Sequence, residues 1–315
     1  MKVLVTRPMT DRATQAIHAA CDATFRDNTP LTEAEAAQAM RDHDAIIPTL
    51  GDAFTAAAFQ GDLRCRLLAN FGAGFNHIDI AAARAAGVTV TNTPDVVTDA
   101  TADIAVTLML MVLRRASEGE RLLRAGEWTG WNPTQLLGSE MSGRTLGIIG
   151  MGRIGKAIAR RCYHGFGMEV VFFNRSTVAD PGVPARQIDD LQDLLRTCDV
   201  AVIAVPGGAG TRGLIGADEL RALGTQGCLV NIARGDVVDE DALIAALTEG
   251  TIAGAGLDVY AREPHVPAAL IAAPNATLLP HLGTATDDTR SRMGLRALEN
   301  LKAFAAGGTP PDLVS

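Results

Sequence analysis

The chain of 315 residues is 47% hydrophobic and 20% charged, which suits a globular protein of about two domains and excludes a disordered or fibrous one. Its net charge of −8 gives no general attraction to nucleic acid or to an anionic membrane surface, so a small anionic substrate would need a local positive site. The five cysteines form no CxxC pair, so neither a zinc cluster nor a disulfide framework is indicated. We therefore expect a cytoplasmic protein without a metal site.

Short apolar runs alternate with alanine-rich helical patterns in the first third of the chain. The expected strands are Val3–Thr6, Ala45–Pro48, Leu67–Asn70 and Val88–Thr91. The expected helices lie near Thr10–Ala20, Thr32–Met40 and Asp79–Ala86. Strands separated by helices predict a parallel α/β sheet. The first apolar run is too short for a signal peptide or a membrane span, so we interpret it as a buried strand.

A long helix is expected from about Asp99 to Arg124. Its middle, Ile104–Leu113, is apolar on almost every face, which argues for burial on more than one side. Part of that surface is expected to lie in a subunit interface. The sequence therefore favours a homodimer formed through the domain that contains this helix.

A second alternating series begins at Thr145. Its expected strands are Leu146–Ile149, Val170–Phe173, Val200–Val205, Cys228–Ile232, Gly254–Val259 and Thr277–Pro280. Six strands with intervening helices predict a doubly wound Rossmann domain that binds a dinucleotide. A last helix, from about Asp287 to Ala306, is expected to pack back on the first unit. The fold class is thus α/β with two doubly wound parallel-sheet domains: a smaller flavodoxin-like substrate domain (1–98 and 285–315) and a Rossmann cofactor domain (99–284).

A glycine-rich turn follows the first strand of this second series. Gly150, Gly152 and Gly155 form the pattern G-x-G-x-x-G immediately before a helical stretch, with Met151, Arg153 and Ile154 between them. Such glycines permit a tight turn, close approach of a pyrophosphate and close helix–strand packing. The helix N-terminus then offers free N–H groups to the phosphates. The alternative is a glycine turn that binds no ligand.

The end of the next strand bears on the choice of cofactor. Asn174 occupies the position at which NAD enzymes usually carry an acidic residue, and Arg175 and Ser176 follow it. Without the carboxylate, a 2′-phosphate is not repelled, and the arginine and serine can bind it. We expect a preference for NADP(H), with NAD(H) possible. The alternative is that Arg175 is only a solvated loop charge.

Three chemically suited residues stand after later strands, at the edge where α/β sheets bind ligands. Arg234 can grip a carboxylate and polarise an oxo group, His281 can donate a proton to the forming alkoxide, and Glu263 beside it would orient the ring. Taken singly, they would more often be a surface ion pair, a structural histidine and a solvated acid. At the same edge, the predicted cofactor contacts also include Val205, Pro206, Ile232, Ala233, His281 and Gly283.

The motifs together resemble the D-isomer-specific 2-hydroxyacid dehydrogenases, in particular the glyoxylate/hydroxypyruvate reductase branch. They are the runs at residues 70–79, 150–155, 231–235, 256–260, 263–264 and 280–283, spread over nearly the whole chain. The resemblance implies that Arg234 binds the substrate, that His281 is the acid/base, and that Glu263 pairs with it. The expected function is NADP(H)-preferring reduction of small 2-oxo acids to D-2-hydroxy acids.

Further roles follow from the resemblance alone. It implies that Asp258 contacts the nicotinamide amide and that backbone N–H groups of Ala73 and Gly74 bind the substrate carboxylate. Leu50 would line the substrate pocket. Trp131 would either enter the partner subunit's site or pack in the dimer interface, and the sequence leaves this choice open.

Two alternative functions remain open from the sequence. One is a dinucleotide-sensing protein like the transcriptional corepressors built on the same scaffold, because the scaffold does not fix function. The other is an NAD-dependent D-2-hydroxyacid dehydrogenase for a bulkier acid. Formate dehydrogenases resemble the chain less, since they carry glutamine where Glu263 stands. The chain also leaves no room after His281 for the regulatory domain of some phosphoglycerate dehydrogenases.

Overall fold

The computed structural model describes residues 1–314, and the chain divides into two compact units. Unit 1 comprises residues 1–97 and the C-terminal segment that starts at Thr284. Unit 2 comprises residues 98–283. Within residues 1–314, no helix combines the length and the apolar character needed to cross a membrane.

Unit 1 is built on a five-stranded parallel sheet with the order β2-β1-β3-β4-β5. Its elements in chain order are β1 (Lys2–Val5), α1 (Asp11–Ala20), β2 (Asp22–Phe25), α2 (Glu33–Asp42), β3 (Ala45–Ile47), the 3-10 helix η1 (Ala56–Phe59), β4 (Leu67–Ala69), α3 (Ile80–Ala85), β5 (Thr89–Thr91) and α11 (Asp287–Ala305). This strand order is that of flavodoxin-like folds. The C-terminal helix α11 belongs to this unit.

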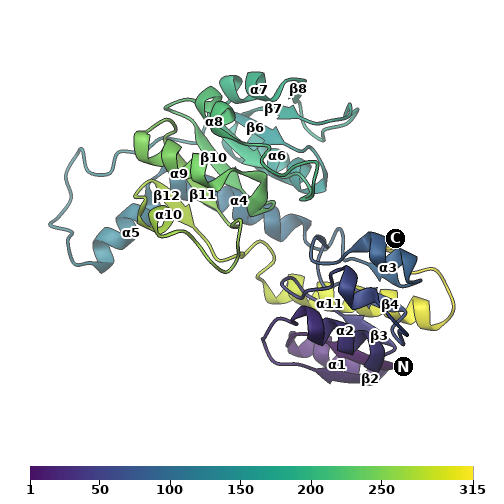
Figure 1. Ribbon diagram of the computed structural model, residues 1–315. Helices are drawn as coiled ribbons and strands as arrows, with labels where there is room; N and C mark the ends of the chain where they lie inside the picture. Colours follow the sequence, from purple (N-terminus) through teal and green to yellow (C-terminus); the bar gives the residue numbers. More distant parts are fainter. Residues whose placement is uncertain (315) are drawn as a thin grey trace. The chain divides into compact units, whose positions relative to one another are not determined.

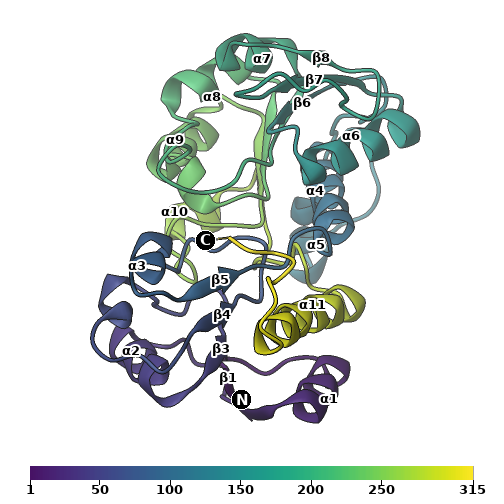
Figure 2. The same cartoon turned by 90° about the vertical axis from the view of Figure 1, so that its right-hand side faces the viewer.

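Alternation along the strands gives the sheet of unit 1 two buried faces. Val3 and Val5 face α1 and α11, whereas Leu4 faces the side of α2 and α3. Figure 2 shows these helix pairs on opposite sides of the strands. Successive side chains of a strand point to opposite faces, so each helix layer covers a core of its own.

Unit 2 is built on a seven-stranded parallel sheet with the order β12-β11-β10-β9-β6-β7-β8. Its elements are α4 (Thr98–Leu113), α5 (Ala116–Arg124), β6 (Thr145–Ile149), α6 (Arg153–Phe166), β7 (Glu169–Phe173), β8 (Arg186–Gln187), α7 (Leu191–Thr197), β9 (Val200–Ile203), α8 (Ala217–Leu223), β10 (Cys228–Asn231), the 3-10 helix η2 (Gly235–Val237), α9 (Glu240–Glu249), β11 (Gly254–Leu257), α10 (Ala268–Ala272) and β12 (Ala276–Leu278). The order is the doubly wound dinucleotide-binding arrangement extended by one strand.

Helices cover both faces of this sheet (Figures 1 and 2). Leu146 and Ile148 of β6 pack on the side of α4 and α6, and Ile149 packs on the side of α7, α8 and α9. The strand order reverses between β6 and β9, which pair with each other. Ligands of open α/β sheets bind outside the carboxyl ends of the strands at this reversal.

The two-sheet α/β prediction is confirmed, but several of its details were wrong. The expected helix from Asp99 to Arg124 is two helices, because Arg115 adopts a left-handed conformation with a φ of 51°. The Leu113 carbonyl instead accepts a hydrogen bond of 2.8 Å from the Ser139 N–H. Two edge strands were missed: β2 is half-exposed and starts at an aspartate, and β8 has only 2 residues. The sheets therefore hold five and seven strands rather than four and six.

Candidate active site

The glycine-rich turn connects β6 to α6. Gly150 has a φ of 102°, and a Cβ there would lie 2.9 Å from the backbone of Ala204, which follows β9. At Gly155 a Cβ would lie 2.3 Å from the Gly150 carbonyl oxygen, so only glycine lets α6 pack this closely. At Gly152, by contrast, a Cβ would meet nothing within 4 Å. The turn thus keeps an open approach to the N-terminus of α6, which fits a bound pyrophosphate.

The rest of this turn separates buried from accessible positions. Met151 is buried, Ile154 is half-buried and Arg153 is exposed at the start of α6. The side chain of Met151 therefore packs in the core on the α4 side of the sheet, leaving only its backbone as a possible contact to a ligand. Sequence reasoning grouped these three residues by position alone and could not make this distinction.

The loop after β7 is ordered by its own polar side chains. The Asn174 Nδ2 donates to the Ser176 carbonyl at 2.9 Å and to the Ser176 hydroxyl at 3.2 Å. Gln187 of β8 donates to the carbonyls of both residues. Arg175 is exposed, and its Nη1 leans toward Gly210 in the loop after β9. No carboxylate stands at residues 174–176, so the loop presents hydrogen-bond donors and a positive charge.

Arg234 follows β10 and carries an unusual unpartnered donor. Its Nη1 donates to the neighbouring Ala233 carbonyl at 2.7 Å, but within residues 1–314 its buried Nε has no hydrogen-bond partner. Burial lowers the pKa of Arg234, whereas the charges of Glu263 and Asp236 oppose that shift. The guanidinium remains charged at any physiological pH. A buried cationic donor without a partner calls for an anionic or carbonyl ligand.

The turn that carries Arg234 is fixed by Asn231, the last residue of β10. The Asn231 side chain accepts from the Ala233 N–H at 3.0 Å and donates to the Arg234 carbonyl at 2.9 Å. The next residue, Gly235, packs against the backbone of Tyr260, where a Cβ would lie 1.8 Å from a carbonyl carbon. This close approach holds the turn after β10 against the segment after β11, where Glu263 lies.

Glu263 and His281 form a hydrogen-bonded pair. The His281 Nδ1 lies 2.8 Å from Glu263 Oε2, and their side chains are 32% and 28% exposed. The other carboxylate oxygen, Oε1, accepts from the Tyr260 N–H at 3.0 Å. Both carboxylate oxygens are therefore engaged, which fixes the ring and leaves Nε2 as the nitrogen free to exchange a proton with a ligand.

The pKa of Glu263 is below its ordinary value. Burial raises this pKa, but the hydrogen bond and charge of His281, the Tyr260 N–H and the Arg234 charge together lower it. Glu263 therefore stays ionised throughout the neutral range. An ionised carboxylate next to an imidazole stabilises the protonated ring.

Asp258 holds the segment that presents His281. Its carboxylate oxygens accept from the Leu282 N–H at 2.6 Å and the Gly283 N–H at 2.8 Å. Its own carbonyl accepts from the His281 N–H at 2.9 Å. Burial raises the pKa of Asp258, and these two N–H donors oppose the shift. His281 itself has a φ of 54°, and these three bonds stabilise that uncommon backbone conformation.

The other predicted contacts of unit 2 lie along the same sheet edge. Val205 and Pro206 follow β9, and Ile232 and Ala233 follow β10. Val205 is half-buried and Pro206 exposed, whereas Ile232 and Ala233 are each 7% exposed. The structure thus brings the glycine turn and the residues after β9, β10, β11 and β12 to one end of the sheet of unit 2.

The remaining predicted residues lie elsewhere. Leu50 follows β3 and is 43% exposed, and Ala73 and Gly74 lie in the loop after β4, all in unit 1. Trp131 is 80% exposed on the segment after α5, so within residues 1–314 it packs into no core. Sequence reasoning missed Asn231 and the Tyr260 N–H as supports of the site. The only feature of the sequence that could have indicated Asn231 is that it is a polar residue at the end of a buried strand.

Comparison with known proteins gives one family. Residues 106–283, more than half of the chain, match the family described as D-isomer specific 2-hydroxyacid dehydrogenase, NAD binding domain. The chain is 43% identical over 281 residues to a glyoxylate reductase of Thermococcus kodakarensis. The aligned region covers 88% of this chain and 84% of the relative.

Solved structures show the same fold over the full length of the chain. A protein of Thermus thermophilus superposes with a TM-score of 0.92 at 38% identity and full coverage of both chains. An NADPH-dependent glyoxylate/hydroxypyruvate reductase of Sinorhizobium meliloti, solved with NADP and malonate, gives a TM-score of 0.89 at 36% identity. This match covers 100% of the present chain and 96% of the other.

Proposed function

Because the chain belongs to the D-isomer-specific 2-hydroxyacid dehydrogenase family, a class of NAD(P)-dependent oxidoreductases, we propose that it reduces small 2-oxo acids such as glyoxylate and hydroxypyruvate. The observation that carries this proposal is the grouping of Arg234 and the Glu263–His281 pair at one end of the sheet of unit 2. A cation with an unpartnered donor and a proton-donating ring are what a 2-oxo acid needs for reduction. Unit 2 is then the cofactor domain and unit 1 the substrate domain.

Each residue has a distinct chemical task. Arg234 binds the substrate carboxylate and polarises the oxo group with its buried guanidinium. His281 donates a proton from Nε2 to the substrate oxygen as negative charge develops there, while Glu263 holds the ring by Nδ1. The backbone N–H groups of Ala73 and Gly74 bind the substrate carboxylate, and Leu50 lines the substrate pocket. Asp258 fixes the backbone after β12 and contacts the nicotinamide amide.

The cofactor is held by the glycine turn and the loops after the neighbouring strands. When bound, the reduced nicotinamide supplies the hydride. The open space at Gly152 and the N-terminus of α6 accept the pyrophosphate. Arg175 and Ser176 bind a 2′-phosphate, which gives a preference for NADPH over NADH. The relative from Sinorhizobium meliloti is itself NADPH-dependent, which supports this assignment.

Arg175→Ala should lower kcat/KM with NADPH by about 10- to 150-fold, since a charge-assisted hydrogen bond contributes ~1.5–3 kcal/mol. NADH carries no 2′-phosphate, so kcat/KM with NADH should change less than about twofold. Steady-state rates with each cofactor at saturating glyoxylate measure both effects. Arg196→Ala, an exposed arginine of α7 that pairs with Asp193, is the matched control. Equal losses with NADPH and NADH would remove Arg175 from the phosphate site.

A panel of 2-oxo acids tests the proposed substrate class. Purified protein should oxidise NADPH with glyoxylate and hydroxypyruvate, and more weakly with acids that carry larger side chains. One methylene changes such binding by only ~1–3 kcal/mol, so activity on several acids is expected. Highest activity on a bulky acid with NADH would favour the alternative dehydrogenase. NADPH binding with no turnover of any acid would favour a dinucleotide-sensing protein.

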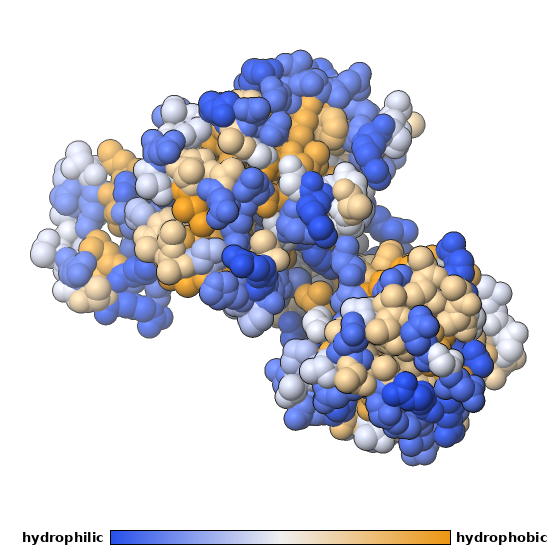
Figure 3. All heavy atoms as spheres, in the orientation of Figure 1, coloured by the Kyte–Doolittle hydropathy of each residue, from blue (hydrophilic) through white to orange (hydrophobic). Residues whose placement is uncertain are grey.

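The segment 116–139, here called the arm, supports a homodimer formed through unit 2. Figure 1 shows α5 and the loop after it projecting from the rest of the unit, and α5 buries no residue. Large apolar side chains are exposed along the arm: Leu123 at 61%, Trp128 at 51%, Trp131 at 80% and Leu137 at 65%. In Figure 3, orange residues lie among blue ones on this projection. Aromatic residues in such a setting are typical of interfaces.

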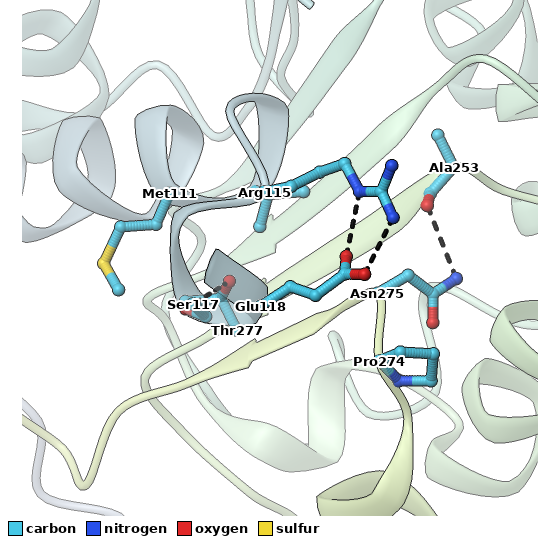
Figure 4. A pocket seen from close by; sticks show the side chains of 9 residues that line it. Met111, Arg115, Ser117, Glu118, Ala253, Pro274, Asn275 and Thr277 are labelled. Atoms are coloured by element: carbon cyan, nitrogen blue, oxygen red, sulfur yellow. Dashed lines mark hydrogen bonds and ion pairs between the residues drawn. The ribbon is translucent and has the colours of Figure 1, made fainter. Parts of the chain in front are cut away.

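The base of the arm is anchored to the sheet edge. In Figure 4, Arg115 and Glu118 form a bidentate ion pair at 2.8 Å beside a hollow of about 360 Å³. The Ser117 and Thr277 hydroxyls lie 3.0 Å apart, and Arg121 donates to the Pro274 carbonyl. These bonds fix where the arm starts, so its exposed apolar part is presented in a defined direction.

Replacing both Leu123 and Leu137 by glutamate should convert a dimer into a monomer, because two charges in an apolar interface are costly. Sedimentation equilibrium of the wild type should give twice the mass of one chain. Gln38→Glu, which adds a charge to an exposed helix face of unit 1, should leave the dimer intact. A monomeric wild type, or a double variant with unchanged mass, would contradict this interface.

A further inference from the structure

The loop after β4 has its carbonyl groups held by two asparagine side chains. Asn70, which is fully buried, donates from Nδ2 to the carbonyls of Gly72 and Gly74, each at 3.0 Å. Asn92, just after β5, donates from Nδ2 to the Ala73 carbonyl at 2.8 Å. Three consecutive carbonyls are therefore fixed by two amides. A carbonyl oxygen only accepts hydrogen bonds, so the amide nitrogen of each asparagine must face it.

Because the carbonyl groups of residues 72–74 are held, the N–H groups on the other side of the same peptide bonds are held as well. The N–H and C=O of a peptide bond point in opposite directions in one plane, so a restrained carbonyl restrains the N–H of the next residue. The N–H groups of Ala73 and Gly74 donate to no other group within residues 1–314. Successive backbone N–H groups held in this way form a concave anion site. At Gly72, a Cβ would come within 3.4 Å of the Asn70 amide nitrogen, so a side chain there would crowd this clamp.

The second asparagine is itself anchored through the C-terminal segment. The Asn92 N–H donates to the Asp312 carbonyl at 3.2 Å, and Asn300 of α11 donates to the Asn92 carbonyl at 3.3 Å. Asn300 also donates to the Asp312 carboxylate at 2.9 Å and accepts from its N–H at 3.0 Å. Arg296 completes the network with a bidentate ion pair to Asp312 at 2.6 and 2.8 Å.

This network joins α11 to the loop through buried polar side chains. Asn70 and Asn300 are fully buried, and Asp312 is 9% exposed. A buried polar group is costly unless it is hydrogen-bonded, so each amide donor of the network favours the one geometry in which it is satisfied. Within residues 1–314 the buried Asn70 Oδ1 has no partner, so Asn70 holds the loop through its amide nitrogen alone. The geometry specified here is that of residues 72–74.

We propose that Asn70 and Asn92 are positioning residues for the substrate: their amides hold the loop at 72–74 so that the Ala73 and Gly74 N–H groups bind the carboxylate of the 2-oxo acid. The inference rests on the proposed function, because it concerns the same carboxylate. It adds two side chains that touch neither substrate nor cofactor. They govern substrate affinity, and cofactor binding in unit 2 is independent of them.

Asn92→Asp and Asn70→Asp test this role. An aspartate keeps the size of asparagine but cannot donate when ionised, and it repels both the loop carbonyls and the substrate carboxylate. Each variant should raise KM for glyoxylate about tenfold or more. A change of this size is expected when one hydrogen bond from the loop to the substrate carboxylate is lost. The Kd of oxamate, an unreactive 2-oxo acid analogue, should rise by the same factor in the presence of NADPH. The value of kcat and the Kd of NADPH should change less than about twofold.

Asn28→Asp, an exposed residue of unit 1, makes the same chemical change away from the loop and should leave every value unchanged. Asn92→Ala provides a second variant if aspartate prevents folding, and it should raise KM by a smaller factor because it removes the donor without adding charge. Thermal unfolding shows that each protein compared is folded. An unchanged oxamate Kd in a folded variant would overturn the inference, as would a parallel loss of NADPH affinity.

The wild type separates this inference from the proposed function. If the wild-type protein binds oxamate and turns over glyoxylate, the proposed function stands. Asparagine variants that then bind oxamate as tightly as the wild type would contradict only the positioning role. If the wild type neither binds nor turns over any 2-oxo acid, the proposed function fails first. Each failure thus has its own readout.

Discussion

His281→Ala should lower kcat for glyoxylate reduction with NADPH by ~10²–10⁴, the usual contribution of a positioned general acid. In the proposed mechanism the ring donates the proton from Nε2, because Glu263 lies 2.8 Å from its Nδ1. Alanine cannot supply that proton, and water must replace it. The Kd of NADPH, measured by fluorescence, should stay close to the wild-type value, so the loss falls on the chemical step.

Two controls sharpen this result. His164→Ala changes an exposed histidine at the end of α6 and should leave kcat within about twofold of the wild type. Glu263→Gln keeps the shape of the partner but removes its charge. Since the ionised Glu263 carboxylate holds the ring by Nδ1, its replacement should lower kcat with little change in the Kd of NADPH. Near-normal kcat in His281→Ala, or an unchanged kcat in Glu263→Gln, would contradict the acid–base assignment.

Arg234→Ala should lower kcat/KM for glyoxylate by roughly 10- to 150-fold, with KM raised and kcat lowered together. Charge-assisted contacts to a buried cation contribute ~1.5–3 kcal/mol each, and in the proposed mechanism Arg234 both binds the carboxylate and polarises the oxo group. The buried Nε of Arg234 has no hydrogen-bond partner within residues 1–314, so it can donate to a bound substrate. Arg234→Lys should recover little, because an ammonium lacks the planar fork.

The control for Arg234 is Arg221→Ala, an exposed arginine of α8 that pairs with Asp218. It removes the same charge from unit 2 without touching the sheet edge, so its kinetics should match the wild type. An unchanged KM in Arg234→Ala would exclude the arginine from substrate binding. A large fall in thermal stability would instead indicate a structural role.

The architecture was predictable because its signals are local and repeated. Buried parallel strands such as Leu67–Ala69 and Val200–Ile203 are short apolar runs between helices, and their order in the chain sets the sheet class. The edge strands β2 and β8 lack that signal, since half of their side chains meet solvent. The break at Arg115 depends on a distant segment, residues 138–139, which occupies the end of α4.

The candidate site was predictable at the level of residue types and strand ends, but not of geometry. Glycine spacing indicated the turn at Gly150–Gly155, and a histidine after a strand indicated His281. No local pattern shows that the Glu263 carboxylate is shared between His281 and the Tyr260 N–H. Likewise, the need for glycine at Gly235 arises from Tyr260, which is far along the chain. Such contacts depend on tertiary packing.

A crystal structure of the protein with NADP⁺ and oxamate would show directly whether Arg234 and His281 act on the same substrate atom. The oxamate carbonyl oxygen should accept hydrogen bonds from both the Arg234 guanidinium and His281 Nε2, at about 2.7–3.2 Å. Oxamate bound away from either side chain, with both left to solvent, would contradict the proposed mechanism.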